Sequence, residues 1–176
     1  SFTHDEPVFA SQRVEHIGQV LGLVVADTHL QARAAAHLAV LKVEAEQAQL
    51  NARDAQSQNA TVLPRVHVAR GDSKAQMQYA PHHTQGQLEI GGQEHYYLET
   101  QIAYAIPQDN GEWLIHSSTQ HPGEAQHWVA HALHIPLHQV RVLCRRMGGG
   151  FGGKETQSGH LAVWAALAAH KTGRPV

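Results

Sequence analysis

The pattern of hydrophobic and polar positions predicts a strand, a helix and a second strand in the first quarter of the chain. Val20–Ala26 is a nearly continuous apolar run, which is typical of a buried strand. Asp27 and Thr28 suit a helix N-cap, and the Ala-rich segment Leu30–Leu38 that follows contains strong helix formers. Val40–Glu44 then alternates like a half-covered strand. We therefore predict a strand–helix–strand unit here.

After a polar connector at residues 45–61, the pattern predicts a sheet accompanied by two helices. Four segments have strand character: Leu88–Ile90, Tyr96–Ile106, Trp113–Ser117 and Val140–Cys144. Pro107–Gly111 contains Asn-Gly, which supplies the positive φ angles of a hairpin turn. One helix is expected from about Pro122 to His134, ending before Pro136, and another from about Glu155 to Lys171. The prediction is an α/β fold of mixed α+β character, divided into segments 1–60 and 61–176.

Composition narrows the class of protein. The chain has 176 residues, 42% hydrophobic and 16% charged, which fits a globular protein. A net charge of −2 gives no reason to expect a nucleic-acid or membrane partner. The single cysteine excludes a disulfide framework and fits a reducing compartment, and no apolar run reaches the roughly 18–20 residues of a membrane span. We expect a cytoplasmic protein.

The two ends predict an internal piece of a longer polypeptide. The chain starts at Ser1 without a methionine, and it stops at Gly173–Val176, where Gly and Pro end a helix.

Histidine is unusually frequent, with 16 residues, and raises the possibility of a metal site. His127, His131 and His134 share a helix face with possible chelating spacing, and His138 follows after Pro136. The apolar stripe of the same helix lies opposite, so we place these histidines on the solvated face. A non-catalytic, His-rich metal-binding or interaction module remains an alternative. His82, His83 and His95 have no assigned role.

The most informative stretch is Met147–Glu155, in which five of nine residues are glycine. It lies between a predicted strand and a predicted helix, whose free N–H groups would face the loop. Glycine lets a ligand approach the backbone closely. The stretch predicts a platform for an anionic or oxo-bearing ligand.

Two nucleotide motifs match this loop by letter only. The P-loop spacing is present, but Glu155 stands where a Mg²⁺-binding Ser or Thr is needed. The dinucleotide fingerprint also fits, yet no following strand carries an acidic ribose-binding residue. A phosphate-binding NTPase is therefore kept only as the lowest-ranked of the hypotheses for this chain.

Three segments, in order, resemble the molybdenum hydroxylase family, most closely the molybdenum-binding subunit of its xanthine dehydrogenase branch. They are Ile90–Glu99, Ser117–Gln120 and Arg146–Glu155. Asp5–Val43 resembles the latter part of the family's hammerhead domain. The resemblance implies a hammerhead-like α/β segment at 1–60 and the N-terminal part of the molybdopterin-binding catalytic domain, with a mixed sheet, at 61–176.

The resemblance also implies roles for individual residues. Gln120 would approach an oxo ligand of the molybdenum and orient the metal centre through its amide N–H₂ group. Phe151 and Gly152 would pass beside the molybdenum ligands, Gly152 offering its backbone N–H. Glu155 would be a catalytic residue that binds substrate, and a carboxylate there favours purine over aldehyde. From the residues alone, Gln120 could instead bond a neighbouring loop, Phe151 could be a hydrophobic plug, and Glu155 could be a first-turn helix residue favoured by the helix dipole.

As a whole, the resemblance implies a fragment of a purine hydroxylase that oxidises xanthine or hypoxanthine. Its cofactors would be molybdenum–molybdopterin here, with 2Fe–2S clusters and FAD on another domain or subunit and NAD as acceptor through that partner. No segment corresponds to the family's general-base glutamate, so the fragment alone should be inactive. Another molybdenum hydroxylase, acting on an aldehyde or N-heterocycle, is the alternative within the family. The apolar face of the helix at Leu161–Ala169 also suggests a homo-oligomer.

Overall fold

A computed structural model describes residues 6–176. Ser1–Asp5, the first five residues of the predicted hammerhead-like segment at 1–60, lie outside the described residues. Two compact units divide the chain. Unit 1 comprises Ser1–Ala39 and Gln93–Val176, and unit 2 comprises Val40–Gly92. The fold is of the mixed α/β class that the pattern predicts.

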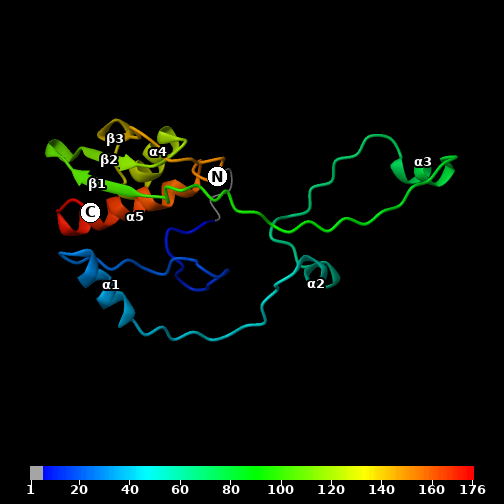
Figure 1. The fold of residues 1–176 in the computed structure, drawn as a ribbon, viewed down its shortest axis with the longest axis horizontal. Coiled ribbons are helices and arrows are strands. Elements are labelled where there is room, and N and C mark those ends of the chain that lie inside the picture. The colour runs from blue at the N-terminus through cyan, green and yellow to red at the C-terminus, as the bar shows by residue number, and fades with distance from the viewer. Residues whose placement is uncertain (1–5) are drawn as a thin grey trace. The chain divides into compact units, whose positions relative to one another are not determined.

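A three-stranded sheet forms the centre of unit 1. Its order is β1 (Ala103–Pro107), β2 (Trp113–Ser117) and β3 (Val140–Leu143), with β1–β2 antiparallel and β2–β3 parallel (Figure 1). The turn between β1 and β2 has positive φ at Asn110 and Gly111, which confirms the predicted hairpin. Because β2 and β3 run in parallel, the chain needs a crossover between them.

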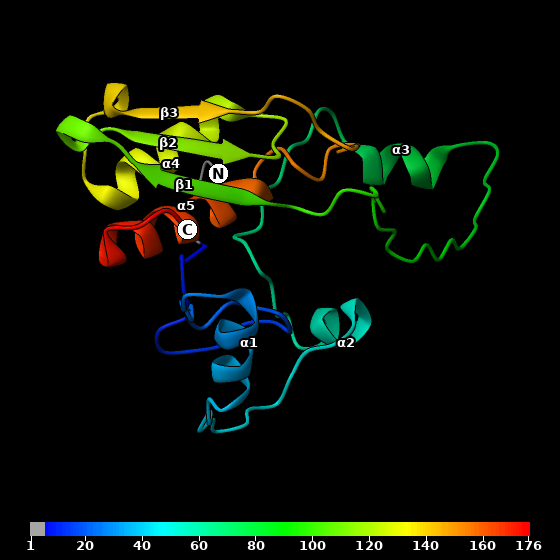
Figure 2. The same cartoon turned by 60° about the vertical axis from the view of Figure 1, so that its left-hand side comes forward.

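Two helices pack against this sheet and against each other. The crossover helix α4 (Pro122–Leu133) connects β2 to β3, and α5 (Gln157–Thr172) follows the glycine-rich loop. Figure 2 shows both helices behind the strands. Short 3₁₀ turns lie at Asp109–Gly111 and Leu137–Gln139.

The core lies between the sheet and these helices. Its buried side chains include Ala105, Ile115 and Val129, which come from β1, β2 and α4, and the alanines of α5 complete it. The apolar face of α5 is therefore covered within the chain. Self-association through this helix stays a prediction, since Leu161, Trp164 and Leu167 of α5 are only partly buried.

The first part of the chain forms the predicted helix but not the predicted strands. Helix α1 (His29–His37) starts with a capping box in which the Thr28 hydroxyl accepts the Gln31 N–H. Val20–Ala26 and Val40–Glu44 have no strand structure, so the strand–helix–strand prediction is wrong for its two strands. A strand is stable only when a neighbour pairs with its N–H and C=O groups along its length. Among the described residues neither segment belongs to a sheet, although Val20 O accepts the Ala10 N–H at 2.9 Å.

The predicted strand boundaries also differ in the middle of the chain. Leu88–Ile90 forms no strand, and the strand expected over Tyr96–Ile106 starts only at Ala103. Glu99, before this strand, bonds the glycine-rich loop, because its N–H donates to Gly148 O over 3.4 Å.

Unit 2 contains little regular structure. Two short helices, α2 (Ala52–Ser57) and α3 (Ser73–Tyr79), interrupt extended segments. The connector predicted at 45–61 therefore contains one short helix, α2. Each helix starts with a side-chain cap, from Asn51 and Asp72 respectively. Throughout the described part of the chain, no helix combines the length and apolar character needed to cross a membrane.

Candidate functional site

The glycine-rich loop connects β3 to α5 and contains several unusual backbone conformations. Gly149, Phe151 and Gly152 have φ angles of 98°, 49° and 93°. Only glycine adopts such angles without strain, so Phe151 is held there by its surroundings. The alternation of positive φ folds the loop tightly, and Gly153 N–H donates to Gly150 O over 2.7 Å.

The side chain of Gln120, just beyond β2, is bound to this loop. Its Oε1 accepts the backbone N–H of Gly152 at 3.0 Å and of Lys154 at 3.2 Å. Two N–H donors require an oxygen, which fixes the orientation of the amide. The Gln120 Nε2 group donates to no residue that the structure describes, and the side chain is exposed. Gln120 thus bonds a neighbouring loop and still has an amide N–H₂ available to a ligand.

The hydrogen bond to Gln120 also determines the direction of the Gly152 N–H. The resemblance implied that Gly152 offers this N–H to a cofactor, whereas here it is bound to Gln120. The N–H₂ group of Gln120 is the free donor in its place.

Lys154, at the end of the loop, is fully buried and makes bonds in three directions. Its Nζ donates to Glu99 O at 2.6 Å, to Glu99 Oε2 at 3.0 Å and to Ser118 Oγ at 2.9 Å. The same ammonium lies 4.7 Å from the centroid of the Tyr97 ring, a cation–π contact. The buried charge is therefore matched by one carboxylate, two further oxygens and an aromatic face.

The backbone of Lys154 extends this network to the end of β2. Its carbonyl oxygen accepts the N–H of Gln120 at 2.8 Å, the hydroxyl of Thr119 at 3.2 Å and the hydroxyl of Ser158 at 3.0 Å. Because these bonds hold the Lys154 carbonyl, α5 begins at Gln157 rather than at the predicted Glu155.

Glu99 binds the beginning of the loop as well as its end. Its Oε2 accepts the Gly148 N–H at 2.8 Å and the Ser118 hydroxyl at 2.6 Å, in addition to Lys154. The Ser118 hydrogen bond, followed by the Gly148 and Lys154 hydrogen bonds, lowers the pKa of Glu99 to about 2. Glu99 is therefore ionised at neutral pH.

Glu155 and Phe151 extend outward from the same loop. Both are exposed, and Phe151 is 76% accessible. Phe151 is thus not a plug within this chain, and Glu155 lies before α5 rather than in its first turn. Lys154 and Glu155 are consecutive but point in opposite ways, one into the protein and one into solvent.

Several glycines of the loop leave no room for a side chain. A Cβ at Gly150 would be 2.5 Å from Gln120 Oε1, and one at Gly153 would be 2.7 Å from the Tyr97 ring and 2.9 Å from His95. These glycines therefore permit the close approach of the loop to Gln120 and Tyr97. His95 forms part of this wall, a place that its sequence position did not indicate.

Sequence reasoning identified Gln120, Phe151, Gly152 and Glu155, and the structure places all four on or against one loop. It missed Glu99 and Lys154, which stand inside two of the quoted segments. Their pairing joins positions 55 residues apart, and no local spacing signals such a contact.

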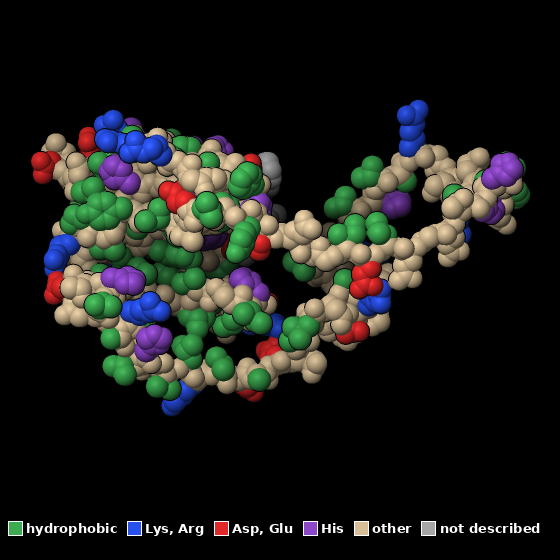
Figure 3. Space-filling model, in the orientation of Figure 1, with side chains coloured by type: hydrophobic (Ala, Val, Ile, Leu, Met, Phe, Trp, Pro, Cys, Tyr) green, Lys and Arg blue, Asp and Glu red, His purple; other side chains and the backbone are tan. Residues whose placement is uncertain are grey.

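The histidines of α4 do not form a comparable cluster. His127 and His131 are exposed, whereas Ala125 and Val129 of the same helix are buried, as the apolar stripe predicts. Across the part of the chain that the structure describes, no three His, Cys, Asp or Glu side chains are placed to hold a metal ion. On the face shown in Figure 3, the histidines are spread rather than gathered.

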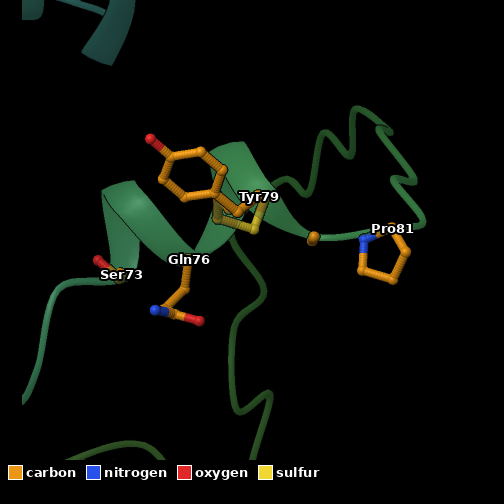
Figure 4. A pocket seen from close by; sticks show the side chains of 6 residues that line it. Ser73, Gln76, Tyr79 and Pro81 are labelled. Carbon is orange, nitrogen blue, oxygen red and sulfur yellow. The ribbon is translucent and has the colours of Figure 1, made fainter.

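Among the described residues, hollows also lie away from the glycine-rich loop, and the one in unit 1 has Glu6, His160 and Trp164 in its lining. One hollow in unit 2 is lined only by α3 and the residues just after it, from Ser73 to Pro81. Figure 4 shows Ser73, Gln76 and Tyr79 pointing in different directions around this helix, with no convergent polar groups.

Comparison with known proteins gives one consistent result. The sequence model of the family described as "Molybdopterin cofactor-binding domain" matches residues 53–176. Xanthine dehydrogenase/oxidase of Mus musculus is 42% identical over 98% of this chain, and aldehyde oxidase 2 of Cavia porcellus is 38% identical over 99%. The chain spans 13% of the length of each of these relatives.

Solved structures agree with this result. Aldehyde oxidoreductase from Desulfovibrio gigas matches with a TM-score of 0.79 and 28% identity, over 97% of this chain and 20% of that one. Quinoline 2-oxidoreductase from Pseudomonas putida 86 matches with a TM-score of 0.81 at 24% identity, covering 97% of this chain and 23% of that one. The second likeness concerns the fold alone.

Proposed function

Because the chain belongs to the family of molybdopterin cofactor-binding domains of the molybdenum hydroxylases, we propose that it forms one wall of the active site of an enzyme that oxidises purines. The observation that carries this proposal is the position of Gln120. Its Oε1 is occupied by two loop N–H groups, which leaves its N–H₂ group to donate to a ligand lying against the loop.

The residues present fit a molybdenum cofactor. Gly152 is exposed, and a Cβ built there would have only His95 Nε2 within 4 Å, at 3.8 Å, so a ligand can approach the backbone at this position. An uncharged amide donor suits an oxo group because it can orient the metal centre without displacing a ligand. When bound, the cofactor would supply the oxidation of the substrate carbon.

This chain's own residues would bind and orient. Gln120 would donate its amide N–H to the metal centre, and the exposed Phe151 ring would exclude water from one side of the ligand. Glu155 would accept a hydrogen bond from a purine N–H and so hold the substrate against the loop. No residue assigned here acts as the general base.

The purine substrate rests on Glu155 and on the similarity to xanthine dehydrogenase/oxidase. The similarity to aldehyde oxidase 2 keeps an aldehyde or N-heterocycle as the second candidate. In both cases iron–sulfur clusters, FAD and NAD would act in other parts of a longer protein, because this chain spans 13% of such relatives. We propose a cytoplasmic location on its composition alone.

Hypoxanthine turnover by the full-length parent tests the proposal. Glu155→Ala should lower kcat/KM for hypoxanthine by about tenfold to a hundredfold, the value of one hydrogen bond to a charged group. Glu112→Ala, another exposed glutamate near the sheet, is the matched control. Equal kinetics for the two variants would remove the assigned role of Glu155. Turnover of aldehydes but not hypoxanthine by the wild-type parent would favour the second candidate.

A further inference from the structure

Three segments distant in sequence converge on the candidate site, and one side chain contacts all of them. The segments are residues 95–99, residues 117–120 and the glycine-rich loop. Lys154 belongs to the loop and bonds Glu99 of the first segment and Ser118 of the second through its ammonium group. It bonds Gln120 through both its N–H and its carbonyl group.

We propose that Lys154, held by Glu99, is a positioning residue that sets the geometry of Gln120 and Glu155 toward the molybdenum cofactor and the substrate. This inference rests on the proposed function. It concerns a residue that touches neither cofactor nor substrate and acts through its neighbours.

The first support is the direction of each bond. Lys154 N–H holds Gln120 Oε1, so the backbone of residue 154 determines where the free N–H₂ group of Gln120 points. With the Lys154 side chain anchored inward, the next residue, Glu155, is directed outward into solvent. A displacement of residue 154 would therefore move both candidate site groups together.

The second support is that Glu99 ties the loop at both ends. Its Oε2 accepts the Gly148 N–H at the start of the loop and the Lys154 ammonium at its end. One carboxylate thus fixes the span that carries Phe151 and Gly152.

The third support is energetic. The Lys154 side chain is 0% exposed, and taking an ammonium group out of water costs several kcal/mol before its partners offset the cost. A well-packed apolar pair of similar size often gives equal or greater stability. A buried charge therefore adds little to stability alone. It does fix the orientation of its neighbours, because each of its hydrogen bonds has a defined geometry.

The experiment uses the full-length parent loaded with molybdenum and the substitution Lys154→Met, which keeps most of the length of the side chain and removes its charge. Lys171→Met, an exposed lysine in the last turn of α5, is the matched control. The measurements are molybdenum content, the Mo(V) electron paramagnetic resonance spectrum, hypoxanthine kcat and KM per bound molybdenum, and the melting temperature.

For Lys154→Met we expect kcat per bound molybdenum to fall by about a hundredfold, as for a misplacement near 1 Å, together with a changed Mo(V) spectrum. Lys171→Met should match the wild type in both. A Lys154→Met protein that melts at a lower temperature but keeps the wild-type spectrum and kcat per molybdenum would show a merely structural role and overturn the proposal.

The double variant Glu99→Gln/Lys154→Met removes both charges at once. It is measured in the same way if the single variant does not yield folded protein. Positioning predicts a folded protein with the same altered spectrum and reduced kcat. Failure of both variants to fold would mean that the pair serves folding, which also overturns the proposal. A wild-type parent that contains no molybdenum would instead refute the proposed function itself.

Discussion

At the scale of single residues, the close contact between Gly150 and Gln120 determines whether the amide can reach a ligand. Any side chain at position 150 would overlap Gln120, since a Cβ there would be 2.5 Å from Oε1. Gly150 contacts the same Gln120 amide group that bonds the loop. A shift of Gly150 or Gln120 would therefore change both the loop and the position of the free N–H₂ donor.

Gly150→Ala should therefore displace Gln120 and lower the molybdenum content or the activity of the parent by about 10–100-fold. Gly91→Ala, where a Cβ would meet nothing within 4 Å, is the control. Metal analysis of the two purified proteins compares them, and equal molybdenum and activity would show that the contact is unimportant.

Glu99 provides a pH test at the same scale. Its folded-state pKa of about 2 lies below its ordinary value of 4.5, so its contribution to stability is present above pH 4.5 and is lost as the pH falls toward 2. Glu99→Gln should therefore be less stable than the wild type near neutral pH, and the difference should shrink between pH 4.5 and 2. Denaturant unfolding of the chain at a series of pH values measures this, and a difference independent of pH would contradict the assigned network.

At the scale of elements, the closest approach of α5 to the Trp128 ring of α4 needs a glycine. Gly159, in the first turn of α5, lies against the Trp128 ring, and a Cβ there would be 2.6 Å from Trp128 Cε3. The ring is fixed in turn, because its Nε1 donates to Glu124 Oε1 at 2.8 Å. The tryptophan has little freedom to yield.

Gly159→Ala should destabilise the chain by about 1–3 kcal/mol, the usual cost of overpacking, although alanine is the better helix former. Gly123→Ala in α4, where a Cβ meets nothing within 4 Å, should be neutral or slightly stabilising. Thermal unfolding compares the two, and a stabilising Gly159→Ala would show that the two helices can separate freely.

The elements that sequence patterns predicted correctly are those whose signals are local. Such signals act within a few residues: Thr28 and Pro122 mark the starts of helices, and the Asn-Gly pair at 110–111 marks a turn. The structure has helix α1, helix α4 and the hairpin at these places. The apolar run Val20–Ala26 failed as a strand because strand formation depends on a partner elsewhere, which hydrophobicity alone does not supply.

At the scale of the whole molecule, the core belongs to unit 1. Every buried hydrophobic side chain among the described residues lies between Ala105 and Ala169, whereas unit 2 exposes large apolar residues such as Val62, Val66 and Leu88. Stability should therefore differ strongly between the two units.

Limited proteolysis of the 176-residue chain should cleave within Val40–Gly92 before it cleaves between Ala103 and Thr172. Mass spectrometry of the early fragments identifies the cut sites. First cleavage inside α4 or α5 would contradict the assignment of the core to unit 1.

The candidate site also shows why part of it could not be predicted. The glycine-rich loop was recognisable from its composition, whereas Gln120 was assigned through the resemblance of Ser117–Gln120 to a segment of the family. The Glu99–Lys154 pair depends on how β1, β2 and the loop come together in space, and either residue alone reads as an ordinary surface charge.

The most direct test of the central claim is the Mo(V) electron paramagnetic resonance spectrum of the parent carrying Gln120→Glu. Glutamate keeps an oxygen to accept the Gly152 and Lys154 N–H groups but has no N–H₂ group to donate. If Gln120 binds the metal centre through that donor, the variant should retain the loop, lose about 10–100-fold in activity per molybdenum and show an altered spectrum. A spectrum and activity identical to those of the wild type would contradict the account.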